Sequence, residues 1–314
     1  MINKVLDGVR QLKSRSKFPK FSEQLLINQG RLLSQTFASK TSIENLTEVE
    51  WKVFSQWGED GILDWIIHQL PGIPEVFIEF GVENYREANT RYLLQARNWK
   101  GMVIDGSADH IADIKQQDLA WRFWLTPINA FITAENINQL IENAGFGGEI
   151  GLLSIDIDGN DYWVWEKISI ANPVVVVVEY NAVFGNKHAI STPYDPAFVR
   201  NKAHFSNQYF GASLPAFNFL AHKKGYQFLG TNHSGVNAFY IRNDHSEKLL
   251  SKIKNIVSFP SRFSDERLDS GELGFTRGVK RQQLINHLPV VNVQSAEIMP
   301  LKQLEPLYSP AWED

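Results

Sequence analysis

The sequence predicts a doubly wound α/β domain over residues 51–242, and three observations lead to that prediction. Short apolar runs alternate with segments of helical periodicity, as strands and helices do around a parallel sheet. One run, Val174–Val178, consists of valine alone, which is typical of a central strand buried on both faces. Four of the runs end in acidic or amide side chains, and open α/β sheets bind their ligands at that edge.

Five strands are expected in the first part of this domain, with helices between them. A polar segment over residues 182–210 is long for a simple connection, so it predicts a lid. A helix over Ala212–Lys224 and a hairpin of Tyr226–Leu229 with Ala238–Arg242 complete the domain. The five strands are Val76–Phe80, Gly101–Ile104, Trp121–Pro127, Gly151–Ile157 and Val174–Val178, and the helices between them are Ala88–Arg97, Ala108–Gln117, Ala134–Ala144 and Asp161–Ser169.

Two flanking regions are expected outside this domain. Residues 1–50 predict an N-terminal helical extension, in which Leu25, Leu26 and Leu32 recur at near-helical spacing and suit packing on the core or a homodimer contact. Residues 47–70 predict a second helix, which the following Pro71 ends. Residues 243–314 predict one or two helices and a poorly patterned tail.

The composition narrows the classes of function. The chain has 314 residues and a net charge of −4, so it offers no basic field for nucleic acid. It has no cysteine, which excludes disulfides, thiolate nucleophiles and cysteine-ligated zinc. No apolar run approaches the roughly 20 residues of a membrane span, and Met1–Leu12 lacks a signal-peptide stretch. We therefore expect a soluble cytoplasmic protein with a small-molecule substrate and neither membrane nor nucleic acid as partner.

Glycine and acidic residues after the first two strands have the spacing of a nucleotide site. Glu79 and Gly81 end the first strand, and Asp105 ends the second, 24 residues (105 − 81) after Gly81. Glycine allows a ligand to approach the backbone, and an acid at the second strand accepts both hydroxyls of a ribose. The bland alternative is a turn glycine and a helix-capping acid. The loop has a single glycine followed by Glu83, which disfavours a pyrophosphate and hence NAD or FAD.

Three segments carry a resemblance to a known family. Glu79-Phe80-Gly81 and Asp105 resemble the first two cofactor-binding motifs of class I S-adenosylmethionine-dependent methyltransferases. Leu153–Asp161, with its Asp-Ile-Asp-Gly core, resembles a segment of FkbM-like methyltransferases, and Phe54–Gly61 resembles a segment that often precedes that core. The resemblance covers residues 51–242 and implies a Rossmann-like methyltransferase sheet of seven strands, the last one antiparallel.

The resemblance also implies roles for individual residues. Glu79, Gly81 and Glu83 would line the amino-acid end of S-adenosylmethionine, and Asp156 would lie beneath its sulfonium. The remaining expected contacts are to the nucleoside: Asp105 with the ribose, Ser107 beside it or as a helix cap, and Asn129 with the adenine.

Acids and amides after the fourth and fifth strands leave a Mg²⁺ site open as a second expectation. Asp156, Glu179 and Asn181 offer oxygen ligands from neighbouring strand ends, and Asp158 lies between them in sequence. The macrocin-type sugar O-methyltransferases, a related group, place acids there to bind a metal that holds two substrate hydroxyls. The alternative is that Asp158 begins a turn and Glu179 makes a structural hydrogen bond.

The catalytic residues expected are Asp156 and a histidine that accepts a proton from the acceptor. His188, His204 and His233 are the candidates, and His233, in the hairpin turn, is preferred because that turn approaches the pocket in the implied fold. The function expected is methyl transfer to oxygen of a small-molecule or sugar-containing metabolite in a biosynthetic reaction. The rivals are another nucleotide- or NAD-binding enzyme on the same sheet, and a non-catalytic interaction scaffold.

Overall fold

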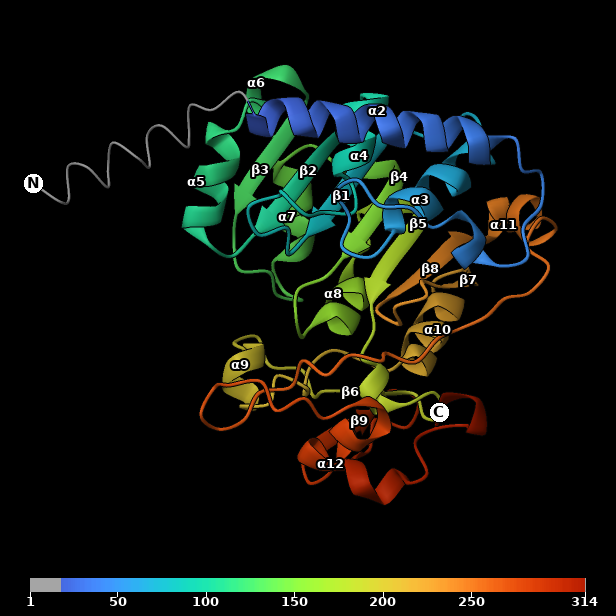
Figure 1. Ribbon diagram of the computed structural model, residues 1–314. Coiled ribbons are helices and arrows are strands. Elements are labelled where there is room, and N and C mark those ends of the chain that lie inside the picture. Colours follow the sequence, from blue (N-terminus) through green and yellow to red (C-terminus); the bar gives the residue numbers. More distant parts are fainter. Residues whose placement is uncertain (1–17, 314) are drawn as a thin grey trace, which may run out of the picture.

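The computed structural model describes residues 18–313, and its centre is a seven-stranded sheet with helices on both faces (Figure 1). The strand order is β3-β2-β1-β4-β5-β8-β7, and β8 is antiparallel to both of its neighbours. This confirms the predicted Rossmann-like sheet of seven strands with its last strand antiparallel. The strands are β1 Val76–Phe80, β2 Lys100–Asp105, β3 Leu125–Asn129, β4 Gly148–Ile155, β5 Ala171–Glu179, β7 Tyr226–Thr231 and β8 Asn237–Arg242.

The two faces of the sheet are covered by different helices. One face packs against α3 (Glu59–His68), α4 (Arg91–Arg97), α5 (Ala108–Gln116) and α11 (Asn243–Leu250), and the other against α7 (Ile137–Asn143), α8 (Asp161–Lys167) and α10 (Leu214–Lys223). The valines of β5 alternate between the two cores: Val175 and Val177 face the first, and Val176 and Val178 the second. All four are buried, so the valine run is a central strand as predicted.

Helix α2 (Phe18–Ala38) lies across the top of the view in Figure 1 and packs on α3 and α4. Its Ile27 enters a small cluster with Trp51, Phe54 and Tyr92, and an ion pair of 2.6 Å joins Glu23 to Arg91. The predicted N-terminal extension, residues 1–50, is an α-helix over Phe18–Ala38 and mostly irregular after it, and its first 17 residues lie outside the described part of the chain.

The expected helix over residues 47–70 is wrong in its first half. A short 3-10 helix, η1 (Leu46–Val49), is followed by irregular chain up to Gly58, and α3 begins at Glu59. The cause is Asp60, whose Oδ2 accepts hydrogen bonds from the backbone N–H groups of residues 53, 54 and 55 at 2.6–2.9 Å. A side chain that satisfies the backbone in this way replaces the helical hydrogen bonds.

The third strand also lies later than predicted. Strand β3 is Leu125–Asn129, and the first part of the expected range belongs to the single turn α6 (Leu119–Arg122). Trp121 and Trp124 are both exposed, so the aromatic residues that suggested a strand are not part of the core. The other strands and helices lie within a few residues of their expected positions.

The C-terminal residues build a second, three-stranded sheet that the sequence did not reveal. Strand β9 (Pro289–Asn292) pairs with β10 (Ile298–Pro300) and with β6 (Ile190–Ser191), which belongs to the expected lid. This layer lies below the carboxyl ends of the main strands in Figure 1. It also contains η2 (Ala182–Phe184), α9 (Arg200–Ala203), η3 (Gly278–Arg281), α12 (Gln282–Ile285), η4 (Leu301–Leu304) and η5 (Pro310–Trp312). Within residues 18–313, each helix is too short or too polar to cross a membrane.

Candidate active site

A cavity of about 640 Å³ opens at the carboxyl ends of β1, β4 and β5, within the size range of small-molecule sites. Its floor is the β1 loop and the ends of β4 and β5. Its roof comes from the lid and from residues 258–276, which we call the strap, the orange chain that crosses below the sheet in Figure 1. The order of strands reverses between β1 and β4, so the cavity lies where open α/β sheets place their ligands.

Gly81 brings the β1 loop and the end of β4 into contact. Its φ is +70°, and a Cβ at this position would lie 1.5 Å from the carbonyl oxygen of Asp156. No other residue fits there without displacing either the β1 loop or the end of β4. The contact places the Asp156 side chain next to the loop that follows β1.

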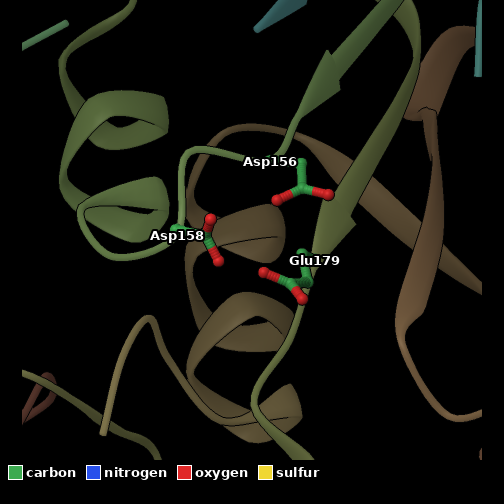
Figure 2. A group of neighbouring side chains, drawn as sticks. All are labelled: Asp156, Asp158 and Glu179. Atoms are coloured by element: carbon green, nitrogen blue, oxygen red, sulfur yellow. The ribbon is translucent and has the colours of Figure 1, made fainter. Parts of the chain in front are cut away.

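Three carboxyl groups converge on the cavity, as Figure 2 shows: Asp156 after β4, Asp158 in the loop before α8, and Glu179 at the end of β5. One oxygen from each lies within 4.8 Å of the others. Asp158 has a φ of +56°, a left-handed conformation that non-glycine residues rarely adopt. The loop is fixed in this shape by Asp161, whose carboxylate accepts hydrogen bonds from the N–H groups of Ile157 and Gly159.

The group of three acids is poorly neutralised. Burial, and then the charge of Glu179, raise the pKa of Asp156 well above its usual range. Burial likewise raises the pKa of Glu179 to about 8. The Oε2 atom of Glu179 is buried and has no hydrogen-bond partner. The pair therefore needs either a proton or a bound cation.

Arg200 is the basic side chain that acts on this group. Its Nη1 donates to Asp158 at 2.5 Å, and its Nε donates to the carbonyl oxygen of Asn207 at 2.8 Å. The guanidinium also stacks on the ring of Phe210, 3.6 Å from the ring centre. Arg200 thus compensates Asp158, whereas Asp156 and Glu179 feel its charge from a greater distance.

Glu79 lines the same cavity, but its carboxylate oxygens already accept hydrogen bonds from the chain itself. It accepts hydrogen bonds from the backbone N–H groups of Asn89 and Thr90 and from the Thr90 hydroxyl, at 2.5–3.1 Å. Burial raises its pKa to about 7. Its contacts fix the return of the β1 loop into α4, so the structure gives it a part in positioning that loop.

The whole cavity is rich in negative charge. Its two guanidinium groups, Arg200 and Arg281, are each paired with an aspartate, Asp158 and Asp265 respectively. The carboxylates that line it are more numerous: Glu79, Glu83, Glu87, Asp156, Asp158, Glu179 and Asp265. This excess suits a cationic ligand and disfavours a pyrophosphate.

The three residues expected at the nucleoside form a separate cluster that does not line the cavity. Asp105 accepts hydrogen bonds of 2.8 Å from the N–H groups of Glu83 and Ser107, and Asn129 donates to its carbonyl oxygen. The Ser107 hydroxyl accepts from the N–H of His110 and caps α5. Asp105 is 9% exposed, and a carboxylate retains further lone pairs, so it can still accept from a hydroxyl.

Asn181 lies at the cavity but has a structural part in it. Its Nδ2 donates to the carbonyl oxygens of Gln208 and Phe210, and its Oδ1 accepts from the N–H of Val183. Its oxygen is therefore already engaged. The third carboxylate beside Asp156 and Glu179 is that of Asp158. The sequence alone also allowed Asp158 to be no more than the first residue of a turn.

The histidines considered as bases are not among the cavity-lining residues. The ring of His233 stacks on Phe259, and its backbone N–H donates to Glu50. His188 contacts the carbonyl oxygen of Pro306, and His204 contacts the hydroxyl of Ser206. The geometry brings together Glu79, Gly81, Glu83, Asp156, Glu179 and Asn181, and it leaves Asp105, Ser107, Asn129 and His233 outside the cavity.

Several cavity residues were not singled out from the sequence, among them Arg200, Arg281, Trp57 and Phe263. Trp57 belongs to the segment Phe54–Gly61, whose resemblance to a recurrent segment was the one signal for it. Phe263 and Arg281 come from the C-terminal region, in which no pattern indicated a functional part.

Searches with protein-family models and among curated proteins find no match. Solved structures with some similarity include an O-methyltransferase family protein from Burkholderia thailandensis, at 13% identity and a TM-score of 0.36, with 59% of each chain covered. Another is the O-methyltransferase from Bacillus cereus in complex with SAH, at 13% identity and a TM-score of 0.39, with 69% of this chain and 89% of that chain covered.

A third is an S-adenosylmethionine-dependent methyltransferase from Clostridium acetobutylicum, at 8% identity and a TM-score of 0.38, with 59% of this chain and 90% of that chain covered. The present chain thus spans 59% of the length of the Burkholderia protein. Similarity at this level does not identify a function, and the proposal below rests on the site itself.

Proposed function

We propose that this protein is an S-adenosylmethionine-dependent methyltransferase that methylates an oxygen of a small-molecule or sugar-containing metabolite. The observation that carries the proposal is the carboxylate-lined cavity at the switch point of the sheet, where Gly81 packs against Asp156. S-adenosylmethionine carries a sulfonium and an ammonium group, and both are cations that this cavity suits.

The chain's own residues would hold the cofactor from the β1 side of the cavity. Glu83 is exposed at the cavity and suits the ammonium group, and Asp156 lies below the expected position of the sulfonium. Asp105, with Ser107 and Asn129 beside it, remains the proposed contact for the nucleoside. The backbone N–H of Glu83 already donates a hydrogen bond to the carboxylate of Asp105. A ribose that binds Asp105 therefore has to lie next to this N–H group.

When bound by these residues, the cofactor would supply an electrophilic methyl group to the acceptor oxygen, with S-adenosylhomocysteine as the other product. The chain must then accept the proton of the hydroxyl. Without a bound cation, whichever of Asp156 and Glu179 is ionised suits this part, because both face the cavity and burial raises the pKa of both carboxyls. The position of His233 does not support its expected part as the base.

Mg²⁺ is proposed as a second cofactor, held by Asp156, Asp158 and Glu179. These carboxylates are the ligand type that Mg²⁺ prefers, and the unpartnered Oε2 of Glu179 fits a group that awaits a cation. Asn181 is replaced in this proposed set by Asp158, since the amide of Asn181 is engaged by its own chain. A metal at this position would orient the acceptor hydroxyl and lower its pKa.

A non-catalytic scaffold is the second candidate, and one observation favours it. The carboxylate of Asp105 is occupied by backbone N–H groups and does not line the cavity, although a nucleoside site at β2 requires it to be reachable. The charge of the cavity gives no comparable support to an NAD-dependent enzyme.

The test is calorimetric titration of S-adenosylmethionine and S-adenosylhomocysteine into wild type, Glu83→Gln and Asp105→Asn, with and without Mg²⁺. We expect micromolar binding to wild type and a loss of about tenfold or more in each variant, which corresponds to one charge-assisted hydrogen bond. Glu297→Gln, at an exposed carboxyl on the C-terminal layer, is the matched control. Absence of binding to well-folded wild type under all conditions would exclude the methyltransferase and leave the scaffold.

A further inference from the structure

The cavity has two parts of opposite chemistry. Its floor is the acidic group at the ends of β4 and β5, whereas one side of its mouth is apolar, with Trp57, Phe263 and Leu273 among the lining residues. The rings of Trp57 and Phe263 stack, with centroids 4.5 Å apart and planes 25° apart. Trp57 remains 38% exposed and Leu273 39% exposed, so this apolar surface is open to solvent.

The stacked pair is fixed in place from both sides. The N–H of Trp57 donates to the buried carboxylate of Glu59 at 2.9 Å, so withdrawal of the loop would remove one donor from that buried group. The strap that carries Phe263 is held through Phe259, whose N–H donates to Thr231 and whose carbonyl oxygen accepts from the Tyr180 hydroxyl. The carbonyl oxygen of Ser261 accepts a hydrogen bond of 2.7 Å from Arg281.

An aromatic surface that is rigid, exposed and part of a cavity wall is suited to a ligand. Aromatic side chains that served only the core would be buried, as Trp65, Trp99 and Trp165 are. Trp121 and Trp124 are exposed too, but they do not line the cavity. Ligand sites commonly combine apolar walls with a few polar groups that fix the orientation of the ligand. Here the carboxyl groups at the ends of β4 and β5 supply the polar groups, and Trp57, Phe263 and Leu273 supply an exposed apolar surface.

We propose that the acceptor is amphiphilic: its hydroxyl-bearing end faces Asp156 and Glu179, and an alkyl or aryl body lies on Trp57, Phe263 and Leu273. This inference rests on the proposed methyl transfer for the identity of the reacting end. It adds to it the class of acceptor, a molecule in which a polar head is joined to an apolar group. A purely polar sugar would leave the mouth of the cavity exposed to water.

The probes that test the apolar wall are three β-D-glucosides with the same head: methyl, octyl and phenyl, each kept below the concentration at which octyl glucoside forms micelles. We expect octyl and phenyl glucoside to bind wild type about tenfold more tightly than methyl glucoside, as burial of some 50–60 Å² of apolar surface predicts. Trp57→Ala and Phe263→Ala should each abolish this preference and leave the weak binding of methyl glucoside unchanged.

Trp121→Ala is the matched control, because Trp121 is 73% exposed and does not line the cavity. It should keep the full preference, and Trp57→Phe should keep most of it. Thermal unfolding identifies any variant that has lost its fold. If Trp57→Ala does not fold, the glucoside preferences of Trp57→Phe and Trp57→Leu are compared instead.

Equal binding of the three glucosides to wild type would overturn the proposal, as would an equal loss in Trp121→Ala. A change of oligomeric state in Trp57→Ala without a change in glucoside preference would overturn it too, because the pair would then be a contact between copies of the chain. S-adenosylhomocysteine is titrated into the same samples. Its failure to bind would refute the methyltransferase, whereas a failed glucoside preference with intact cofactor binding refutes only the amphiphilic acceptor.

Discussion

The carboxylate of Glu59, in the first turn of α3, accepts a hydrogen bond of 2.6 Å from the side-chain amide of Asn232, which follows β7 and is 173 residues away in sequence. The same oxygen accepts from Asn237 at 2.8 Å, and the other oxygen accepts from the N–H groups of Trp57 and Gly58. One buried carboxylate therefore joins the loop before α3 to the β7–β8 hairpin, and both contribute to the cavity wall.

Glu59→Gln should destabilise the protein by about 3 kcal/mol, because a glutamine amide cannot accept at both positions and leaves buried donors unpaired. Urea unfolding followed by circular dichroism measures the change. Glu75→Gln, at an exposed carboxyl just before β1, should shift the midpoint little. A loss for Glu59→Gln no larger than for Glu75→Gln would show that the four hydrogen bonds contribute little.

Arg200→Gln should bind Mn²⁺, used as a spectroscopic substitute for Mg²⁺, about fivefold more tightly than wild type. The reason is that removal of the guanidinium frees Asp158 and removes a positive charge that a cation must overcome, worth about 1 kcal/mol at roughly 4 Å in water-like surroundings such as those of the exposed Asp158. Electron paramagnetic resonance of free Mn²⁺ gives the affinity. Arg267→Gln, at an exposed arginine of the strap, is the control. Weaker binding in Arg200→Gln would argue against a cation between these acids.

Glu50→Gln should stabilise the protein in alkaline but not in acidic solution. Burial raises the pKa of Glu50 to about 7, above its ordinary value of 4.5. A raised carboxyl pKa means that the folded state holds the proton more tightly, so stability falls as pH rises from 4.5 through 7. The glutamine keeps an acceptor for the N–H of His233 and removes this dependence.

The expected gain at pH 9 is roughly 1 kcal/mol, after allowance for the partial solvent exposure of Glu50. At pH 4 the two proteins should be equally stable. Chemical unfolding at pH 4, 7 and 9 measures the difference, with the exposed-site variant Glu297→Gln as reference. A gain that is the same at all three values would assign the effect to packing instead of charge.

A homodimer through the exposed leucines of α2 stays a prediction. Leu25 is 53% exposed and Leu32 is 65% exposed, and they lie seven residues apart, on the same side of the helix. Leu25→Gln combined with Leu32→Gln should convert a dimer into a monomer in sedimentation velocity at micromolar concentration. Wild type that sediments as a monomer up to the highest soluble concentration would contradict this prediction.

The sheet was predictable because its signals are local. The valines of β5 show a strand buried on both faces, and the acids that follow β4 and β5 mark the edge at which ligands bind. The pairing of the acids was predictable in part: Asp156 and Glu179 do converge. Whether Asn181 or Asp158 completes the group depends on hydrogen bonds to Gln208 and Val183, which the sequence does not display.

The layer that the lid forms with the C-terminal residues was not predictable, for a physical reason. Its strands β6 and β10 have two and three residues, too few for an alternating pattern, and β6 pairs with a segment about a hundred residues later. Likewise, the first half of the helix expected over residues 47–70 is absent because the side chain of Asp60 accepts hydrogen bonds from backbone N–H groups there. Such contacts depend on the tertiary structure and produce no periodic pattern in the sequence.

The division of the cavity between two stretches of sequence has a consequence for how the protein can change. The residues proposed for S-adenosylmethionine lie between 79 and 156, whereas most of the roof that faces the acceptor lies after residue 181, in the lid and the strap. Substitutions in the strap can therefore alter the acceptor without touching the methyl-donor side. Variation among homologous chains should accordingly be concentrated in the strap and the lid, and exchange of these two segments together should transfer acceptor preference from one chain to another.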